Sequence, residues 1–403
     1  HKASGMLYFK DSKEGCRAVV MMRGLLDENG ETIVKSAELL DKKSLSAAKD
    51  PTGEGLTAVL TQTMAVSKEK LDENIKVITK ALDKFDTFIP VLFTDDPAIY
   101  SKYWAIRAGI FPAVGGTRRP GTTCLIEDVA FHIDHLPEAT AELQELLVKH
   151  KYDDACIYGH ALEGNYHFII NQAFDSQEEV DRYENLMSDV TKLVVDKYDG
   201  SLKAEHGTGR NMAPFVKYEW GEQAYLLMKD VKDLFDPKGL LNPGVIFNDD
   251  PKCYIKNFKP LPLTHPLIDK CIECGFCEVN CLTCGLTLSS RQRIILRREI
   301  VRLEKDQSDP ERLKELKKSF KYLGEQTCAG DGLCATSCPM GINTGDLTHV
   351  IREENLPVGS FGYKVGNYAA NHFAGIKSVL RPTLTLANFT HSVLGTSFMS
   401  GIT

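Results

Sequence analysis

The sequence lacks the marks of several large protein classes. Its apolar runs stay below the roughly 20 residues of a membrane-spanning helix. Its net charge of −7 leaves no basic surface of the kind that binds nucleic acid. No Gly-x-Gly-x-x-Gly turn follows a predicted strand, so the usual dinucleotide-binding fingerprint is missing. We therefore expect no membrane-spanning helix, no nucleic-acid partner and no nucleotide fold of that type.

We find no secretory signal at the start of the sequence, which opens at His1 rather than Met. This favours a cytoplasmic protein, with a peripheral position on the inner face of a membrane as the second possibility. The late stretch 376–403 is apolar but broken by Lys377, Arg381 and Pro382. We interpret it as an ordinary packed tail, although it could lie against a partner or a membrane surface.

At 403 residues the chain has room for two or three domains. Strand-like segments alternate with helix-like ones over residues 1–250, which favours an α+β domain built from βαβ units. We predict strands at 5–10, 56–64, 90–93, 128–133 and 166–170, and helices at 12–25, 139–149 and 177–199. A proline-rich linker at 251–265, a cysteine-rich domain at 266–345 and a tail at 346–403 complete the predicted organisation.

Cysteine is present at unusual density in one segment. Eight of the 12 cysteines lie between positions 271 and 338, as C-x2-C-x2-C-x3-C, a single cysteine, and C-x5-C-x3-C-P. Runs of this kind ligate iron–sulfur clusters. Cysteines so closely spaced bridge poorly as disulfides, and structural zinc uses two C-x2-C pairs. We predict two iron–sulfur clusters, with a zinc-stapled interaction module as the alternative.

The spacing also predicts which cysteines share a cluster. In two-cluster arrangements the last cysteine of each run ligates the other cluster. This assigns Cys271, Cys274, Cys277 and Cys338 to a first cluster, and Cys281, Cys328 and Cys334 to a second. The expected fourth position of the second cluster holds Asp331. Three outcomes stay open: Asp331 ligates a 4Fe-4S cluster, Cys284 substitutes, or the site holds a 3Fe-4S cluster.

A basic run lies on the helix predicted between the two cysteine groups. It consists of Arg291, Arg293, Arg297 and Arg298. We interpret it as a solvated helix face, with a docking patch for an acidic redox partner as the minority alternative. The scattered Cys16, Cys124, Cys156 and Cys253 are interpreted as buried small hydrophobic residues.

A second chemical signal comes from histidine. His160 and His167 can converge only if the chain turns between them, and Gly164-Asn165 is a turn signal. Glu205 and His206 follow in an Ala-Glu-His-Gly segment. Two histidines and one carboxylate form a typical catalytic metal set with an open coordination position.

These motifs together carry a resemblance to a known family. H-x6-H, then A-E-H-G-x-G, then D-P-K-G-L-L-N-P-G at 236–244 resemble the C-terminal domain of FAD-linked oxidases of the vanillyl-alcohol-oxidase superfamily. D-lactate and D-2-hydroxyglutarate dehydrogenases with a fused iron–sulfur domain look most similar, over about residues 5–345. The resemblance implies an antiparallel sheet with helices, followed by a mainly helical, two-cluster ferredoxin-like domain.

The resemblance also implies roles for single residues. His160, His167 and Glu205 would hold a divalent metal, zinc by preference, and His206 would be the general base. Arg107 would bind the substrate carboxylate, with Arg118 and Arg119 as further candidates. Asn165 and Asn242 would contact the flavin. The family's turn reads H-x-G-D-G-N, whereas Leu162 and Glu163 stand here in place of a Gly and the Asp, so the sequence departs from the family at this turn.

The function implied is oxidation of a small D-2-hydroxy acid to the 2-oxo acid. Electrons would pass from FAD through the clusters to a quinone, a cytochrome or a further domain. We expect FAD to be held mostly by a domain or subunit outside this sequence, which we interpret as a fragment of a longer protein. The alternative is a non-catalytic iron–sulfur electron-transfer subunit.

Overall fold

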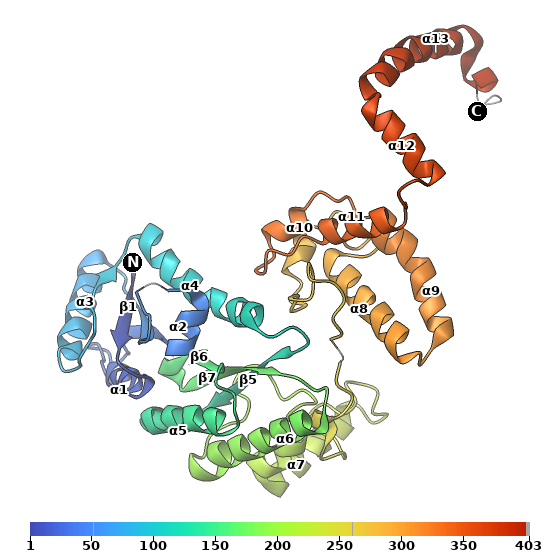
Figure 1. The fold of residues 1–403 in the computed structure, drawn as a ribbon. Helices are drawn as coiled ribbons and strands as arrows, with labels where there is room; N and C mark the ends of the chain where they lie inside the picture. The colour runs from blue at the N-terminus through green and yellow to red at the C-terminus, as the bar shows by residue number, and fades with distance from the viewer. Residues whose placement is uncertain (51, 260, 400–403) are drawn as a thin grey trace.

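The computed structural model describes residues 1–50, 52–259 and 261–399 (Figure 1). An α+β unit occupies the N-terminal side, an irregular segment follows, and a helical unit carries the clustered cysteines. Two helices beyond that unit project away from the rest of the molecule. The architecture thus agrees with the predicted fold class.

The α+β unit is built on an antiparallel sheet. Its seven strands within the described residues run in the order β4-β1-β3-β2-β6-β7-β5. They are β1 Lys2–Phe9, β2 Val34–Leu40, β3 Thr57–Met64, β4 Phe93–Thr94, β5 Thr123–Ala130, β6 Cys156–Gly159 and β7 Asn165–Gln172. Every neighbouring pair is antiparallel.

The predicted βαβ units are present in split form. Strands β1 and β2 both pair with β3 between them, so they run parallel to each other, joined by α1 Ser12–Arg23. Strands β5 and β6 have the same relation around β7, joined by α5 Leu136–Lys149. The sheet therefore has two similar halves, which meet where Leu39 and Leu40 of β2 pair with Gly159 and Tyr158 of β6.

Helices cover both faces of the sheet, so alternate strand residues enter two separate cores. Leu7 and Leu39 pack on one face, below α1, α3, α5 and α6, while Met6 and Leu40 pack on the other, below α2 and α4. The helices not yet bounded are α2 Lys42–Ala48, α3 Lys68–Leu82, α4 Pro97–Thr117 and α6 Gln177–Thr191. Burial on both faces explains why these strands read as apolar runs.

Two predicted strands differ from the structure. Of residues 90–93 only Phe93 is in a strand, because β4 is a short edge strand of two residues. The strand predicted at 128–133 is β5, which begins earlier and ends at Ala130. A short 3-10 helix follows at Ile133–His135.

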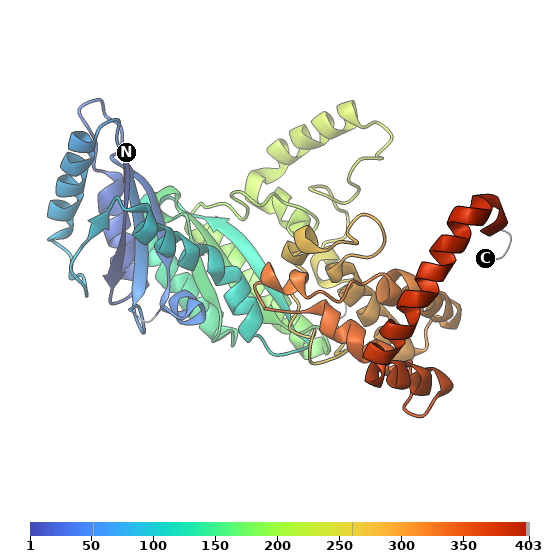
Figure 2. The same cartoon turned by 90° about the horizontal axis from the view of Figure 1, so that it is seen from above.

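The cysteine unit folds around its own small core. After α7 Val216–Phe235, it contains α8 Ser290–Asp306, α9 Pro310–Phe320, α10 Leu333–Thr336 and α11 Thr344–Glu354. Ile268, Ile300 and Leu347 are among the buried residues of this core. Asp309 caps α9 by accepting a hydrogen bond from the N–H of Arg312 at 2.9 Å, as the Asp-Pro pair predicts. Figure 2 shows α4 running from the sheet toward this unit.

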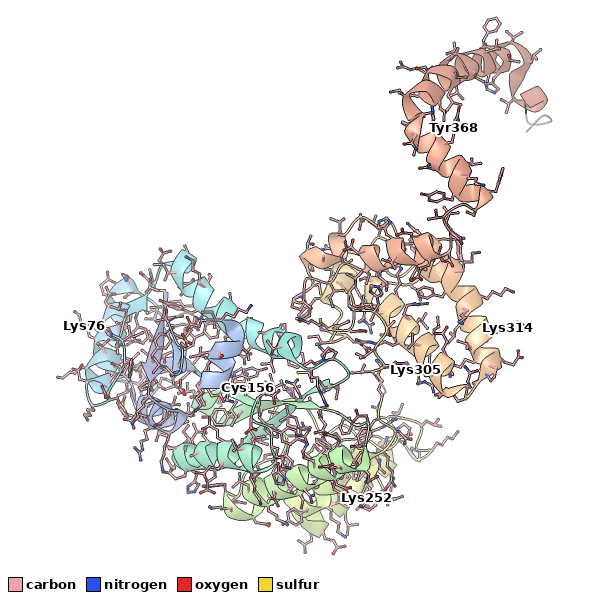
Figure 3. All side chains as sticks on the ribbon, in the orientation of Figure 1. Lys76, Cys156, Lys252, Lys305, Lys314 and Tyr368 are labelled. Carbon is pink, nitrogen blue, oxygen red and sulfur yellow. The ribbon has the colours of Figure 1, made fainter. Side chains whose placement is uncertain are left out.

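The interpretation of the C-terminal stretch as a packed tail is wrong for its described part. Neither α12 Phe361–Asn371 nor α13 Phe373–Met399 has a buried residue among its described side chains, and Tyr368 stands well away from the body in Figure 3. The physical reason is that α11 already completes the core of the cysteine unit. No helix among the described residues is long and apolar enough to cross a membrane; positions 400–403 of the predicted tail lie outside those residues.

Candidate metal and iron–sulfur sites

His160 and His167 converge where the two halves of the sheet meet. His160 follows β6, and His167 lies on β7 opposite Tyr158. The turn between them passes through Gly164, whose φ of 70° is left-handed. A Cβ there would collide with the carbonyl oxygen of Phe131, so only glycine fits this close approach. The turn thus brings both imidazoles to one side.

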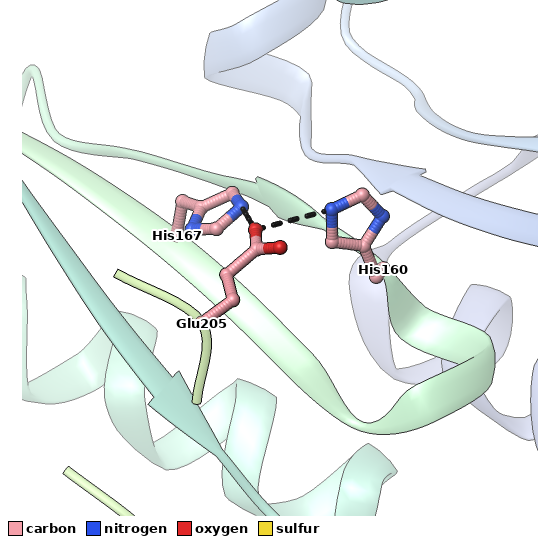
Figure 4. Close-up of side chains that lie close together, drawn as sticks. All are labelled: His160, His167 and Glu205. Carbon is pink, nitrogen blue, oxygen red and sulfur yellow. Dashed lines mark ion pairs between the residues drawn. The ribbon is translucent and has the colours of Figure 1, made fainter. Parts of the chain in front are cut away.

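Glu205 completes a compact set of ligand atoms (Figure 4). Its Oε1 lies 2.9 Å from Nε2 of His167 and 3.2 Å from Nε2 of His160. One ligand atom from each residue lies within 4.8 Å of the others. A tetrahedral ion with ligands at about 2.1 Å separates its donors by about 3.4 Å. The three side chains therefore fit a divalent cation, with room for a fourth ligand.

Asp128 fixes the segment that carries Glu205. This carboxylate is fully buried, and its Oδ2 accepts hydrogen bonds from the N–H groups of Ala204, Glu205 and His206 at 2.8–2.9 Å. Its Oδ1 accepts one from the amide of Asn165 at 2.6 Å. Although burial raises the pKa of Asp128, these hydrogen bonds bring it below its ordinary value. Asp128 was outside the predicted site, and its buried position could not be read from the sequence.

Glu38 on β2 links the histidines to Arg107 on α4. This carboxylate is 3% exposed. Its Oε1 lies 2.5 Å from Nδ1 of His160, and its Oε2 accepts a hydrogen bond from Nε of Arg107 at 3.0 Å. A carboxylate behind a ligating imidazole fixes the ring and makes it a stronger ligand. Sequence analysis missed Glu38, because nothing in its local pattern separates it from any other strand glutamate.

The protonation states of the two histidines differ. Burial, together with the charge of His206, lowers the pKa of His167 to about 4. Its imidazole is therefore neutral near pH 7, as metal binding requires. The hydrogen bond to Glu38 raises the pKa of His160. Burial would raise the pKa of Glu38, but the contacts with His160 and Arg107 lower it.

His206 lies directly beside the metal set. Its ring stacks on that of His167, with centroids 4.6 Å apart and planes at 3°. Its side chain is 36% exposed, so a ligand can reach it. The guanidinium of Arg107 lies over the Tyr158 ring, and within the described residues only its Nε makes a hydrogen bond. The Nη groups are thus free to bind an anion.

The two asparagines predicted to contact flavin lie in different settings. Asn165 is buried and donates its amide to Asp128 and to the carbonyl of Val129, which gives it a positioning role in the fold. Asn242 is exposed in the loop after α7, with a φ of 45°. That loop contacts the Glu205 segment, because Arg210 donates to the carbonyl of Pro243 at 3.2 Å.

The clustered cysteines line two separate cavities. One is lined by Cys271, Cys274, Cys277 and Cys338. The other is lined by Cys281, Cys328, Cys334 and Asp331. These are the two groups that the spacing predicts, although ligation itself stays a prediction. Cys284 is exposed and lines neither cavity. Of the scattered cysteines, Cys16 and Cys156 are buried, whereas Cys124 and Cys253 are half-buried.

Three arginines lie in environments other than those expected from the sequence. Arg293 and Arg298 are only 2% and 4% exposed, so the basic run is not a solvated face or a docking patch as a whole. Arg293 donates to the carbonyl of Gly324 and to Sγ of Cys281, and Arg298 pairs with Glu273. Arg118, a candidate for substrate binding, is buried and hydrogen-bonded to carbonyls of the cysteine segment. Arg119 is exposed.

Comparison with known families follows this division of the chain. Residues 1–246 match the model of FAD linked oxidases, C-terminal domain, and residues 267–342 match that of the 4Fe-4S dicluster domain. The antiparallel sheet unit and the cysteine-rich helical unit thus correspond to the two family matches. Because the first match covers more than half of its length, the chain belongs to the FAD linked oxidases.

Several curated proteins are similar to the chain. Glycolate oxidase subunit GlcD of Bacillus subtilis is 23% identical over 54% of this chain and 46% of its own length. D-2-hydroxyglutarate dehydrogenase of Stutzerimonas stutzeri is 32% identical over 30% and 26%. D-lactate dehydrogenase [cytochrome] of Arabidopsis thaliana is 26% identical over 52% and 37%. The chain thus spans less than half of the length of each of these relatives.

Proposed function

We propose that this chain is the substrate-binding and electron-relay part of a flavin-dependent dehydrogenase acting on small D-2-hydroxy acids. The observation that carries the proposal is the meeting of His160, His167 and Glu205 beside His206, with Arg107 joined to the same site through Glu38. The names of the similar proteins, which refer to lactate, 2-hydroxyglutarate or glycolate, support this substrate class.

The residues divide the work of binding. His160, His167 and Glu205 would hold a divalent cation, which when bound polarises the 2-hydroxyl and lowers its pKa. Arg107 would pair its free Nη groups with the substrate carboxylate, which a guanidinium fork suits. Glu38 contacts both Arg107 and His160 and so fixes their positions relative to each other. A hydroxyl and a carboxylate on adjacent carbons would then be recognised together.

His206 would take the hydroxyl proton. Its ring is held parallel to His167, and its backbone N–H is fixed by Asp128, so the base stays beside the metal set. Bound FAD would supply a hydride acceptor for C2 of the substrate. A positioned general base contributes about 10²–10⁴-fold to turnover.

An exposed apolar surface supports the presence of a further domain or subunit that covers it and binds FAD. Trp220, Leu227, Leu234 and Phe235 of α7 and Leu241 after it are 56–77% exposed. Large exposed apolar residues that gather in one segment are typical of interfaces. The surface adjoins the loop of Asn242, which contacts the Glu205 segment. We infer that a flavin-binding domain or subunit covers it, with Asn242 near the flavin.

For the second iron–sulfur cavity we propose Asp331 as the fourth ligand. Asp331 lines that cavity with Cys281, Cys328 and Cys334, whereas the alternative Cys284 does not. A carboxylate is a weaker ligand than a thiolate for a soft iron site. Loss of one iron from this position would leave a 3Fe-4S cluster.

Two kinds of measurement test the proposed function. The first is the iron content: anaerobically purified protein should contain roughly seven or eight irons per chain, and reduced clusters should be visible by EPR.

The second is the activity of the complete flavin-containing enzyme. D-2-hydroxy acids should reduce a dye faster than L-isomers, and a chelator should abolish this dye reduction. His206→Ala should lower turnover at least about 10²-fold with unchanged flavin content, while His135→Ala, an exposed control, should not. Chelator-resistant activity would contradict the metal assignment.

A further inference from the structure

Arg118 connects the substrate-binding unit to the first cysteine cavity. It lies directly after α4, is 5% exposed, and donates to the carbonyls of Gly115 at 2.7 Å and Thr122 at 3.0 Å. Its Nη groups also donate across the boundary, to the carbonyls of Asp269 at 3.2 Å, Lys270 at 2.8 Å and Cys271 at 3.0 Å. One side chain thus holds the backbone that presents Cys271 to its cavity.

The approach of α4 to this cavity depends on two glycines. A Cβ on Gly115 would lie 2.8 Å from Ile272, and one on Gly116 would collide with the end of the Met340 side chain. Ile272 and Met340 both line the first cysteine cavity. The end of α4 is therefore packed directly on the wall of that cavity.

The charge of Arg118 has no carboxylate partner among the described residues. Its neighbour Arg298 also donates to the carbonyl of Cys271, at 3.0 Å, but pairs with Glu273 at 2.6 Å. The hydrogen bonds of Arg118 all go to carbonyl oxygens, and Glu273, which lines the same cavity, acts on it only as a nearby charge. A buried charge that makes no ion pair is costly, whereas an iron–sulfur cluster with four thiolates carries net negative charge. Such a cluster beside Cys271 would supply a further counter-charge.

We propose that Arg118 raises the reduction potential of the first cluster. This cluster, whose cavity wall packs on α4 of the α+β unit, would then accept an electron more readily than it would without the charge of Arg118. The inference rests on the proposed iron–sulfur function. One-electron reduction adds a negative charge to the cluster, which a nearby fixed positive charge stabilises. Net charge and hydrogen bonding are established determinants of cluster potential. Arg118 is a positioning residue, because it contacts the backbone of Cys271 and not the cluster.

The second cavity offers a matched control. Arg293 is also buried, and its Nη1 lies 3.6 Å from Sγ of Cys281, a predicted ligand of the second cluster. The experiment is an EPR-monitored titration with dithionite of the full chain, as wild type, Arg118→Gln and Arg293→Gln. Signals are assigned with Cys274→Ser, which removes a predicted ligand of the first cluster only.

Arg118→Gln should shift the first-cluster potential downward and leave the second unchanged, whereas Arg293→Gln should shift the second alone. An unchanged first-cluster potential in Arg118→Gln, or equal shifts of both clusters, would overturn the inference. If Arg118→Gln loses the iron of the first cluster, the charge-conserving variant Arg118→Lys is measured instead. A first cluster that is retained in Arg118→Lys with a potential near that of wild type supports the charge effect. Loss of iron in Arg118→Lys as well, or a much lower potential, overturns the inference. Wild-type protein without iron would instead contradict the proposed function.

Discussion

Single residues outside the recognisable motifs hold the candidate metal site together. Glu38 touches His160 and Arg107, and Asp128 holds three consecutive N–H groups of the Glu205 segment. The grouping of His160, His167 and Glu205 could be predicted from residue type and spacing, while their ligation of a metal stays a prediction. Their supporting carboxylates could not, because long-range pairing of strands places them there, and that pairing leaves no local pattern.

Glu38→Gln tests this support. The variant keeps the shape of the side chain but removes the charge behind His160, so metal affinity should fall by about 10–100-fold. Competition with a chromogenic chelator measures the change. Glu31→Gln, at an exposed position, serves as the control, and an unchanged affinity in Glu38→Gln would show that His160 needs no carboxylate behind it.

Asp331 can be tested through the iron count. If it is the fourth ligand, Asp331→Ala should lose about one iron per chain and show the EPR signal of an oxidised three-iron cluster. Asp331→Cys should keep the full content, because a thiolate is the preferred ligand. Cys284→Ser should change nothing, since Cys284 lines neither cavity. Loss of iron in Cys284→Ser would reverse the assignment.

At the scale of elements, the sequence predicted the positions of strands and helices better than the contacts that their residues make. Helix α9 begins where Asp309-Pro310 indicates, and α5 and β7 lie where apolar periodicity places them. The basic run on α8 was misinterpreted because periodicity cannot show that an arginine is satisfied by buried carbonyls. Arg298 is such a case.

Helix α4 allows a comparison of two glycines on one element. A Cβ on Gly109 would meet nothing within 4 Å beyond the backbone of its own helix, whereas Gly115 faces the stiff side chain of Ile272. Gly109→Ala should stabilise the protein by up to about 1 kcal/mol through helix propensity. Gly115→Ala should instead be destabilising relative to it by about 1–3 kcal/mol, because of overpacking. Chemical denaturation measures both, and equal stabilities would contradict close packing of α4 on the cysteine unit.

The loop after α7 should respond to acid. Hydrogen bonds from Lys232 and from the N–H groups of Leu241 and Leu240 lower the pKa of Asp236 to about 2. Because the folded pKa lies below the ordinary value near 4, this stabilisation is complete above about pH 4 and is lost as the pH falls toward 2.

Hydrogen exchange can follow this loop. Protection of the Leu240 and Leu241 amides, corrected for intrinsic exchange rates, should fall between about pH 4 and pH 2. Asp236→Asn should show low protection at all pH values, and Asp249→Asn, an exposed neighbour, should behave as wild type. Constant protection across this range would contradict the role of Asp236.

For the whole molecule, α12 and α13 should be dispensable for folding. Their described side chains include Phe361, Phe373 and Phe389, which are 65–84% exposed. Removal of residues 357–403 should change the free energy of unfolding by less than about 0.5 kcal/mol. Removal should also reduce any binding to lipid vesicles and any self-association, because the exposed apolar residues are then absent. Thermal unfolding measures the stability, and sedimentation measures vesicle binding and self-association. A large loss of stability would show that the helices pack on the body.

The junction of the two sheet halves has a consequence for how the protein responds to metal supply. Leu39 and Leu40 of β2 pair with Gly159 and Tyr158 of β6, and Glu38 approaches His160 across this junction. An ion bound there would add a further link between two sheet halves whose apolar residues already share one core. Its binding energy would add to their cohesion in proportion to the logarithm of ion concentration. Starvation for the ion would therefore lower the stability of the α+β unit as a whole.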